Sequence, residues 1–161
     1  RTSGPKPLMV LAEVLRRLAP RLDAYLSGVW ADRLIDGMTA TADPRALADL
    51  AEGLRQVAPR LGADEAEEAA ERLCDLTARG GGSSPDRLAA FAALAGRLHG
   101  QQILNLLKDP ACVGPFRQAV LQRSAEAWKR PFHDVWELVD WLQANDPDLD
   151  LTSPPVRPDQ P

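Results

Sequence analysis

The stretch LAEGLRQVAPRL, residues 50–61, decides the fold because the chain carries a near copy of it one period earlier. The copy, LAEVLRRLAPRL at residues 11–22, is identical at most of its positions. In both copies apolar side chains recur every three or four residues, the spacing that buries one stripe of an α-helix. Each copy then reaches a proline, Pro20 or Pro59, which removes a backbone donor and ends the helix. The stretch therefore predicts a repeated helix.

The repeat extends beyond this helix. The segment WADRL at residues 30–34 has its counterpart in AAERL at residues 69–73, and DPRAL at 43–47 has its counterpart in SPDRL at 84–88. A period of about 40 residues that covers two amphipathic segments is typical of stacked helical pairs. The sequence thus predicts an all-α fold of stacked antiparallel helical hairpins, a HEAT/TPR-like α-solenoid closed by a C-terminal helical capping unit.

The chain divides into three parts on this interpretation. Tryptophans gather after residue 109, and prolines without helical periodicity follow residue 145. The expected parts are helical repeat pairs over 1–99 (about 7–46, 47–87 and a partial pair over 88–108), a helical capping unit over 109–144 and a Pro-rich extended tail over 145–161.

Individual helices follow from the apolar spacing. The second helix of the first pair should run from Asp23 or Ala24 to about Thr39, and further helices are expected over 63–78, 101–108, 116–128 and 132–144. The inward-facing positions expected on these helices and on the repeated one include Leu18, Leu26, Trp30, Leu34, Met38, Leu54, Val57, Cys74, Phe91, Phe116 and Leu142.

Composition narrows the class of protein. Hydrophobic residues make up 45% of the 161 residues, enough to bury a sizeable core, and the strong share of alanine and leucine favours helix. A net charge of -4 argues against a general nucleic-acid binder, which would show a basic stripe. No apolar run approaches a membrane span, so we expect a cytoplasmic protein without membrane or nucleic-acid partners.

These repeats resemble a known group of sequences. The alternation of LAEGLRQVAPRL, AAERL and TADPRAL is similar to the tandem Ala/Leu-rich repeats of large planctomycete multidomain proteins, where such arrays are attached to protein kinases or to caspase-like and trypsin-like proteases. The stretch ILNLLKDPACVGPFRQAVL (103–121), with RPFHDVWELVDWL and DLTSPPVRP after it, resembles the segment that closes these arrays. The resemblance implies a noncatalytic helical region at a carboxyl end and supplies no site residues. The glycines at 80–82 and the incomplete third pair depart from it.

A nucleophilic site is the first enzymatic possibility to weigh. Cys112 has His99 and His133 at modest distances in the sequence, and a cysteine paired with a histidine is a known nucleophilic arrangement. No catalytic signature surrounds Cys112, however, and two isolated cysteines are too few for a disulfide framework or a metal site. We therefore interpret Cys74 and Cys112 as structural residues, and we expect no catalytic activity and no cofactor.

Two other motifs fail on their spacing. Asp146, Asp148 and Asp150 alternate like the start of a calcium-binding loop, but leucine stands at the sixth position and arginine at the twelfth, so an acidic linker is favoured. The glycines at 80–82 do not follow a strand and are not followed by a Lys-Ser/Thr pair, which excludes a phosphate-binding loop.

The remaining candidate for a functional site is a binding surface. Trp136 and Trp141 are separated by about 140° around a helix, so a single buried stripe does not easily cover both. Trp141 is the better candidate for a partly exposed aromatic anchor, although packing by the tail or the preceding helix is an alternative. The predicted function is protein–protein interaction or scaffolding, with a separate protein or the parent protein's own domains as partner, in a larger bacterial signalling or defence protein. The alternative is a regulatory segment that a protease cuts near Gly80–Ser84.

Overall fold

The computed structural model describes residues 10, 13–14, 16–81, 84–112, 114–152 and 155. Residues 1–9, 11–12 and 15 at the amino-terminal side, and most of the tail after residue 152, lie outside these ranges. The described part of the chain is helical and holds no strand, which confirms the all-α prediction. The α-helices are α2 (Ala24–Ala40), α3 (Pro44–Val57), α4 (Ala63–Leu76), α5 (Pro85–Ala95), α6 (Gly100–Lys108), α7 (Pro115–Trp128) and α8 (Val135–Asn145), and the short turns are η1 (Ala19–Arg21), η2 (Ala58–Arg60) and η3 (Thr77–Gly81).

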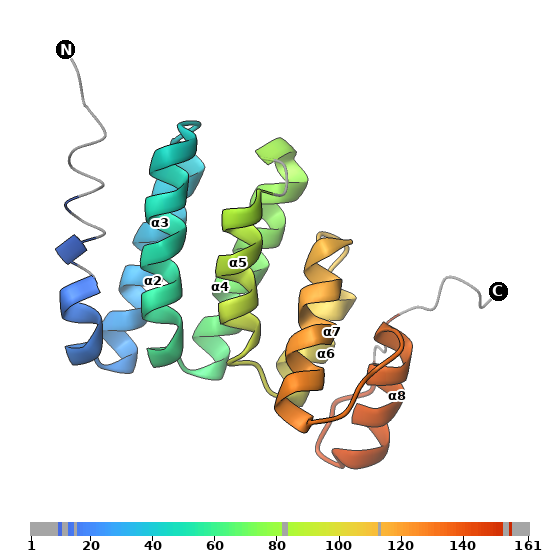
Figure 1. The fold of residues 1–161 in the computed structure, drawn as a ribbon. Helices are drawn as coiled ribbons and strands as arrows, with labels where there is room; N and C mark the ends of the chain where they lie inside the picture. Colours follow the sequence, from blue (N-terminus) through green and yellow to red (C-terminus); the bar gives the residue numbers. More distant parts are fainter. Residues whose placement is uncertain are drawn as a thin grey trace.

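The helices lie in two layers. Helices α3, α5 and α7 lie side by side in one layer, and α2, α4 and α6 lie behind them in a second (Figure 1). Each helix packs against the next member of its own layer, as α3 does against α5 and α2 against α4. The layers are joined by α2 packing on α3 and α4 packing on α5, while α8 packs on α7. The chain therefore alternates between the two layers as it proceeds.

Side-chain caps fix where the helices begin. A carboxylate or hydroxyl just before each of four helices accepts a backbone N–H of the first turn, which satisfies a donor that the helix itself leaves unpaired. These caps are Asp23 to Leu26 N (2.8 Å), Asp43 to Arg45 N (3.1 Å), Ser84 to Arg87 N (3.2 Å) and Asp134 to Glu137 N (2.8 Å). Proline at the first position of α3, α5 and α7 suits the same place, where no donor is needed.

The repeated proline forms the same turn in both copies. Helix α3 ends at Val57, and Ala58–Arg60 continues as a single 3₁₀ turn that Leu61 N closes on Ala58 O at 3.1 Å. Residues Ala19–Arg21 form the same turn in the earlier copy, with Leu22 N bonded to Ala19 O at 3.2 Å. The proline thus ends each helix as expected and turns the chain into the second layer.

One hydrophobic core runs through the stack. Leu34, Leu54, Leu73, Phe91 and Leu104, each on a different helix, are fully buried in it. Its other fully buried large side chains include Ile35, Met38, Leu50, Leu61, Leu94 and Phe116.

Two positions expected in this core are instead exposed. Leu18 is 39% exposed and Leu26 is 43% exposed. Leu26 lies about 80° around α2 from Leu34, whose stripe meets the core, and so falls on the outer side of the first pair.

The segment that forms α5 is shorter than the segment that forms α3 by about one helical turn. From the residue that caps the helix to the leucine at the corner after it (the corner leucine), the earlier segment runs from Asp43 to Leu61, whereas the later one runs only from Ser84 to Leu98. Accordingly α5 has 11 residues and α3 has 14. The loss between cap and corner is close to one full turn, so the buried face is preserved. This shortening explains why the sequence period becomes irregular here.

An arginine ties the end of α5 to the corner after α3. Arg97 follows α5 and donates from Nε and Nη2 to the carbonyl oxygen of Leu61, at 3.1 Å and 3.0 Å. Leu61 lies at the corner between η2 and α4, where a carbonyl is free of helical bonding. The charged double hydrogen bond therefore fixes this corner against the end of α5.

Candidate interaction surfaces

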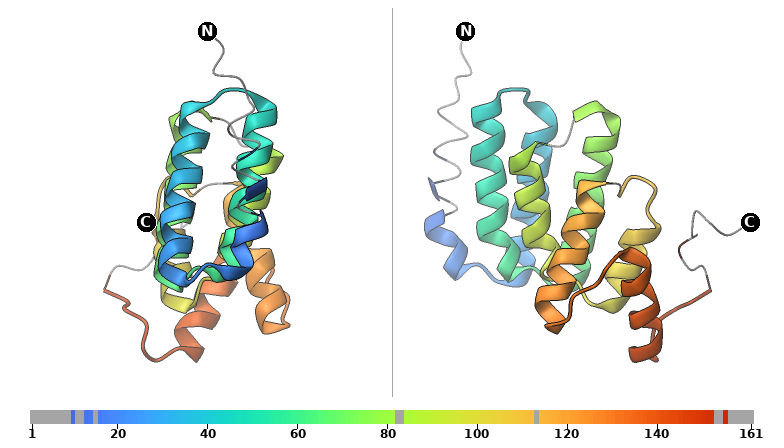
Figure 2. Two further views of the ribbon diagram at one scale, coloured as in Figure 1. Left: turned by 90° about the vertical axis from the view of Figure 1, so that its left-hand side faces the viewer. Right: turned by 45° about the vertical axis from the view of Figure 1, so that its right-hand side comes forward.

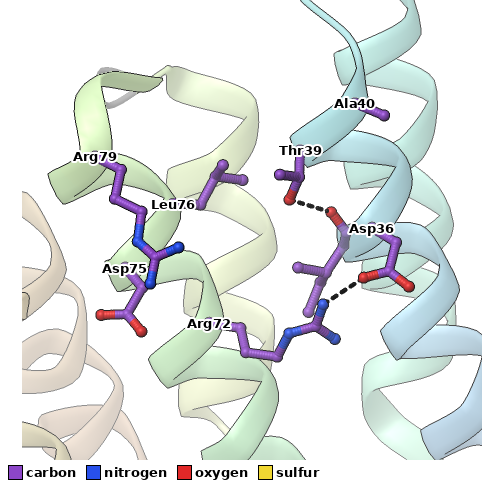
Figure 3. A pocket seen from close by; sticks show the side chains of 8 residues that line it. Asp36, Thr39, Ala40, Arg72, Asp75, Leu76 and Arg79 are labelled. Carbon is purple, nitrogen blue, oxygen red and sulfur yellow. Dashed lines mark hydrogen bonds and ion pairs between the residues drawn. The ribbon is translucent and has the colours of Figure 1, made fainter.

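A groove opens between the C-terminal halves of α2 and α4 (Figure 3). It encloses about 440 Å³. Ile35 and Leu76 supply its apolar part, and charged side chains of both signs surround them. The remaining lining residues are Asp36, Thr39, Ala40, Arg72, Asp75 and Arg79.

Arg72 holds the two walls of the groove together. From α4 its Nη1 binds Asp32 Oδ1 at 2.8 Å, and its Nη2 binds Asp36 Oδ1 at 2.6 Å, one turn further along α2. These ion pairs contribute about 1 kcal/mol to stability, because a third of the arginine side chain and more of each carboxylate remain in solvent. Glu68 stands one turn before Arg72 on α4, yet Arg72 reaches the neighbouring helix.

A second hollow of about 490 Å³ continues the groove toward the helix ends. It shares Thr39, Leu76 and Arg79 with the first and reaches the start of α3 and the turn η3. Gly80 stands there with φ of 103°, a backbone conformation that favours glycine. Arg79 extends along the edge of the groove beside Asp75 (Figure 3). The two hollows adjoin at Thr39, Leu76 and the exposed Arg79.

Amide side chains tie α6 to α4. Gln102 Nε2 donates to Asp64 Oδ1 at 3.1 Å, and Asn105 Nδ2 donates to Glu67 Oε1 at 2.9 Å. Beyond α6 the chain returns to this layer, where Asp150 N donates to Gln101 Oε1 at 2.7 Å. Polar contacts therefore join α4 to α6, and α6 to the segment after α8.

Negative charge collects toward the C-terminal ends of α4 and α6. Burial raises the pKa of the Glu71 carboxyl, and the nearby charges of Glu67, Asp109, Asp75 and Glu68 raise it further. Counted from the corner leucines Leu98 and Leu61, Asp109 stands at the position in the third pair that Arg72 holds in the second. The third pair thus presents an acid where the second pair presents an arginine, and the carboxylates repel each other.

Replacing Glu71 by glutamine should stabilise the protein at pH 7. Its pKa is raised by folding, so the folded state takes up protons between the ordinary carboxyl pKa and the raised one, and stability falls as pH rises through that window. Glu71→Gln should remove this fall and add roughly 0.5–1 kcal/mol at pH 7, the size of two or three relieved like-charge pairs. Urea unfolding from pH 4 to pH 7 measures both effects. A variant with the same pH profile as the wild type would contradict the assignment.

The two tryptophans predicted to bind a partner lie at the edge of the core. Trp141 is partly buried against Trp128 of the preceding helix and against Phe132, with ring centroids 4.8 Å and 5.7 Å apart. Trp136 is also partly buried and packs on the core. Both contacts favour the alternative in which neighbouring segments cover these rings. Partner binding by Trp136 and Trp141 stays a prediction.

The start of α8 differs from the expected one. The helix begins at Val135 instead of Phe132, because Asp134 caps it and Glu137 accepts from the backbone N–H of His133 at 2.7 Å. This bond, together with Arg130, lowers the pKa of Glu137. Phe132 is left in the preceding loop, where Arg130 lies 5.6 Å over its ring.

The cysteines and histidines that could suggest chemistry occupy different environments. Cys74 and Cys112 are fully buried free thiols. A hydrogen bond with the Cys112 thiol and the surrounding apolar core raise the pKa of Cys74 far above its usual range. His99 and His133 are both exposed, at the starts of α6 and α8. The burial of Cys112 matches a structural thiol, since a reactive one needs access and thiolate character.

The aspartates after α8 bond to backbone. Asp146 Oδ1 accepts from Asp148 N at 3.1 Å, and Asp150 Oδ1 accepts from the backbone and hydroxyl of Thr152 at 3.0 Å and 2.7 Å. These Thr152 bonds lower the pKa of Asp150. Among the described side chains, no group of three or more histidines, cysteines, aspartates or glutamates is placed to hold a metal ion.

Comparisons with family models, with curated proteins and with solved structures find no match for this chain. No helix in the described ranges combines the length and hydropathy of a membrane span. The fold and its surfaces thus define a class, an all-helical protein with helices in two layers and a charged groove between two of them.

Proposed function

We propose that this chain is a noncatalytic protein–protein interaction module of the α-solenoid type, part of a larger cytoplasmic bacterial signalling or defence protein. Two-layer packing with a sequence period of about 40 residues supports stacked helical hairpins of the HEAT/TPR kind. The observation that carries the function is the groove between α2 and α4.

The groove has the chemistry of a protein-binding surface. Its accessible apolar side chains, Leu76 and Ala40, offer area to a partner's anchor residue. Asp36, Asp75 and Arg79 flank them with both signs of charge. Opposite charges beside an apolar contact fix the register of a partner and reject wrong ones. The favoured occupant is a peptide segment with an apolar side chain between an acidic and a basic residue.

The groove is also held in place before any partner arrives. Arg72 bridges the two helices, and Ile35 is almost fully buried in the core beneath. A preformed site loses little conformational freedom on binding, so more of the contact energy appears as affinity.

Substitutions in the groove should weaken partner capture by the full-length protein. Leu76→Arg places a bulky charge on the groove's apolar wall, and Arg79→Glu reverses the charge at its edge. Each should weaken binding at least about tenfold, as expected for loss of an anchor or of a charge pair. Cross-linking mass spectrometry on the native complex identifies the partner, and titration with that partner gives the affinity.

Arg55 is a suitable control because it is an exposed arginine on α3, in the other layer. Arg55→Glu should bind the partner like the wild type. Equal binding by all three variants would place the interaction elsewhere, and a wild-type protein without any cross-linked partner would remove the proposal.

The alternative function, cleavage near Gly80–Ser84, is less well supported. Arg79 and Gly80 are exposed and offer a protease a site, while residues 82–83 lie outside the described ranges. However, α5 packs on both α3 and α4, and Arg97 ties it to Leu61. A chain cut here should therefore stay together on size-exclusion chromatography after limited proteolysis, and separation of the fragments would favour the switch.

A further inference from the structure

One stripe of α4 faces back toward α2. Glu65 and Arg72, two turns apart, lie on it. A Cβ added to Gly28 of α2 would be 3.5 Å from Glu65 Cγ, and Arg72 binds Asp32 and Asp36 of the same helix. The stripe therefore joins the second-layer helix of one pair to that of the pair before it.

Helix α6 uses the same stripe. Gln102 follows the corner leucine Leu98 by the same interval as Glu65 follows Leu61, and it binds Asp64 on α4. The joint between α2 and α4 and the joint between α4 and α6, meaning the contacts between neighbouring second-layer helices, thus share one geometry. In each, a side chain at the same repeat position reaches back to the preceding helix. The residue types differ between the two joints.

The matching stripe on α2 is exposed. Counted from Leu22, the corner leucine of the first pair, Leu26 and Arg33 hold the positions of Glu65 and Arg72, and Val29 lies between them. Leu26 is 43% exposed, Val29 is 41% exposed, and the adjoining Tyr25 is 77% exposed. In an end-on view α2 stands at the front of the stack (Figure 2, left). Three neighbouring apolar side chains in solvent beside an arginine form the pattern of an interface more than that of a solvated face.

We propose that this face of α2 binds another helical pair of the same repeat type, whose second helix presents two carboxylates one turn apart. Such a helix would cover Leu26 and Val29 and would give Arg33 the two partners that Asp32 and Asp36 give Arg72. The inference rests on the stacked-pair architecture proposed above and is carried by continuity with the joint between α2 and α4.

An added repeat tests this directly. Residues 4–42 form one period and carry the Asp32–Asp36 pair, so a second copy of them is joined ahead of Gly4. A docked repeat adds an interface to the stack, so the extended chain should unfold in one transition, with a urea midpoint higher by on the order of 1 M and a steeper denaturant dependence. An unchanged midpoint, or a separate early transition for the added copy, overturns the proposal.

Variants on the α2 face separate docking from general stability. Arg33→Ala and Leu26→Asp, made in the original copy, should remove at least half of the gain in midpoint from the extended chain and leave the unextended chain nearly unchanged. Arg55→Ala, which changes an exposed arginine in the other layer, should affect both chains equally. Equal losses in both chains for Arg33→Ala and Leu26→Asp would show a role within the pair and would overturn the proposal.

A second copy of the whole chain is the competing occupant. Sedimentation of the unextended protein should show a monomer at micromolar concentration. A dimer that Leu26→Asp converts to a monomer would assign the face to self-association, against the proposal. These readouts do not involve the groove between α2 and α4, so a failure here leaves partner binding there to be judged separately.

Discussion

Phe91→Ala should lower the free energy of unfolding by about 3–5 kcal/mol, the range for truncating a buried aromatic side chain. Phe91 is fully buried on α5, which packs against α3, α4 and α7. Its ring lies 4.5 Å from that of Phe116 at an angle of 61°, a favourable edge contact. Urea unfolding followed by circular dichroism measures the loss.

Two comparisons make this result specific. Phe91→Leu retains most of the buried volume and should lose much less, about 1–1.5 kcal/mol. The double variant with Phe116→Ala should show coupling of roughly 0.5–1.5 kcal/mol, because the rings touch. A loss below about 1 kcal/mol for Phe91→Ala would mean that α5 does not occupy the middle of the stack.

The two thiols of the native protein should react with a disulfide reagent at least about a thousandfold more slowly than those of the unfolded chain. Cys74 and Cys112 are fully buried, and folding raises the pKa of Cys74, so little thiolate is present to react. Reaction then requires opening of the core, which for a domain of ordinary stability is populated at about one part in a thousand or less. Absorbance after mixing at pH 8, with and without urea, measures the ratio.

Single-cysteine variants complete the experiment. Cys74→Ala and Cys112→Ala should each leave one protected thiol, and both should protect their remaining thiol strongly if α4 and the segment before α7 open together. Rapid labelling of Cys112 in the native protein would contradict its burial and support its interpretation as a nucleophile.

The helices could be predicted because their signals are local. The spacing in LAEGLRQVAPRL, the proline after it and the caps at Asp23 and Asp43 act within one or two turns, and the structure has helices and turns at those places. The shorter α5 is harder to predict, since the missing turn shows only in the shorter interval from Ser84 to Leu98.

The candidate surfaces could not be predicted because they depend on contacts between repeats. Arg72 has Glu68 one turn away in the sequence, yet it bonds to Asp32 and Asp36 on another helix. Leu26 has helical spacing to Leu34, but its burial depends on which neighbour stands beside α2. The signal available in hindsight is that Arg33 recurs as Arg72 one period later, at the position from which α4 reaches the neighbouring helix α2.

The bond from Arg97 to the Leu61 carbonyl also bears on how the stack deforms. It fastens the end of α5 to the corner after α3, at one end of these two neighbouring helices. A bending motion between α3 and α5 therefore pivots at this corner and displaces the opposite ends of the two helices most. Tension along the molecule would separate those opposite ends first. A partner bound in the hollow around Arg79 would resist this separation, and tension would in turn weaken its binding.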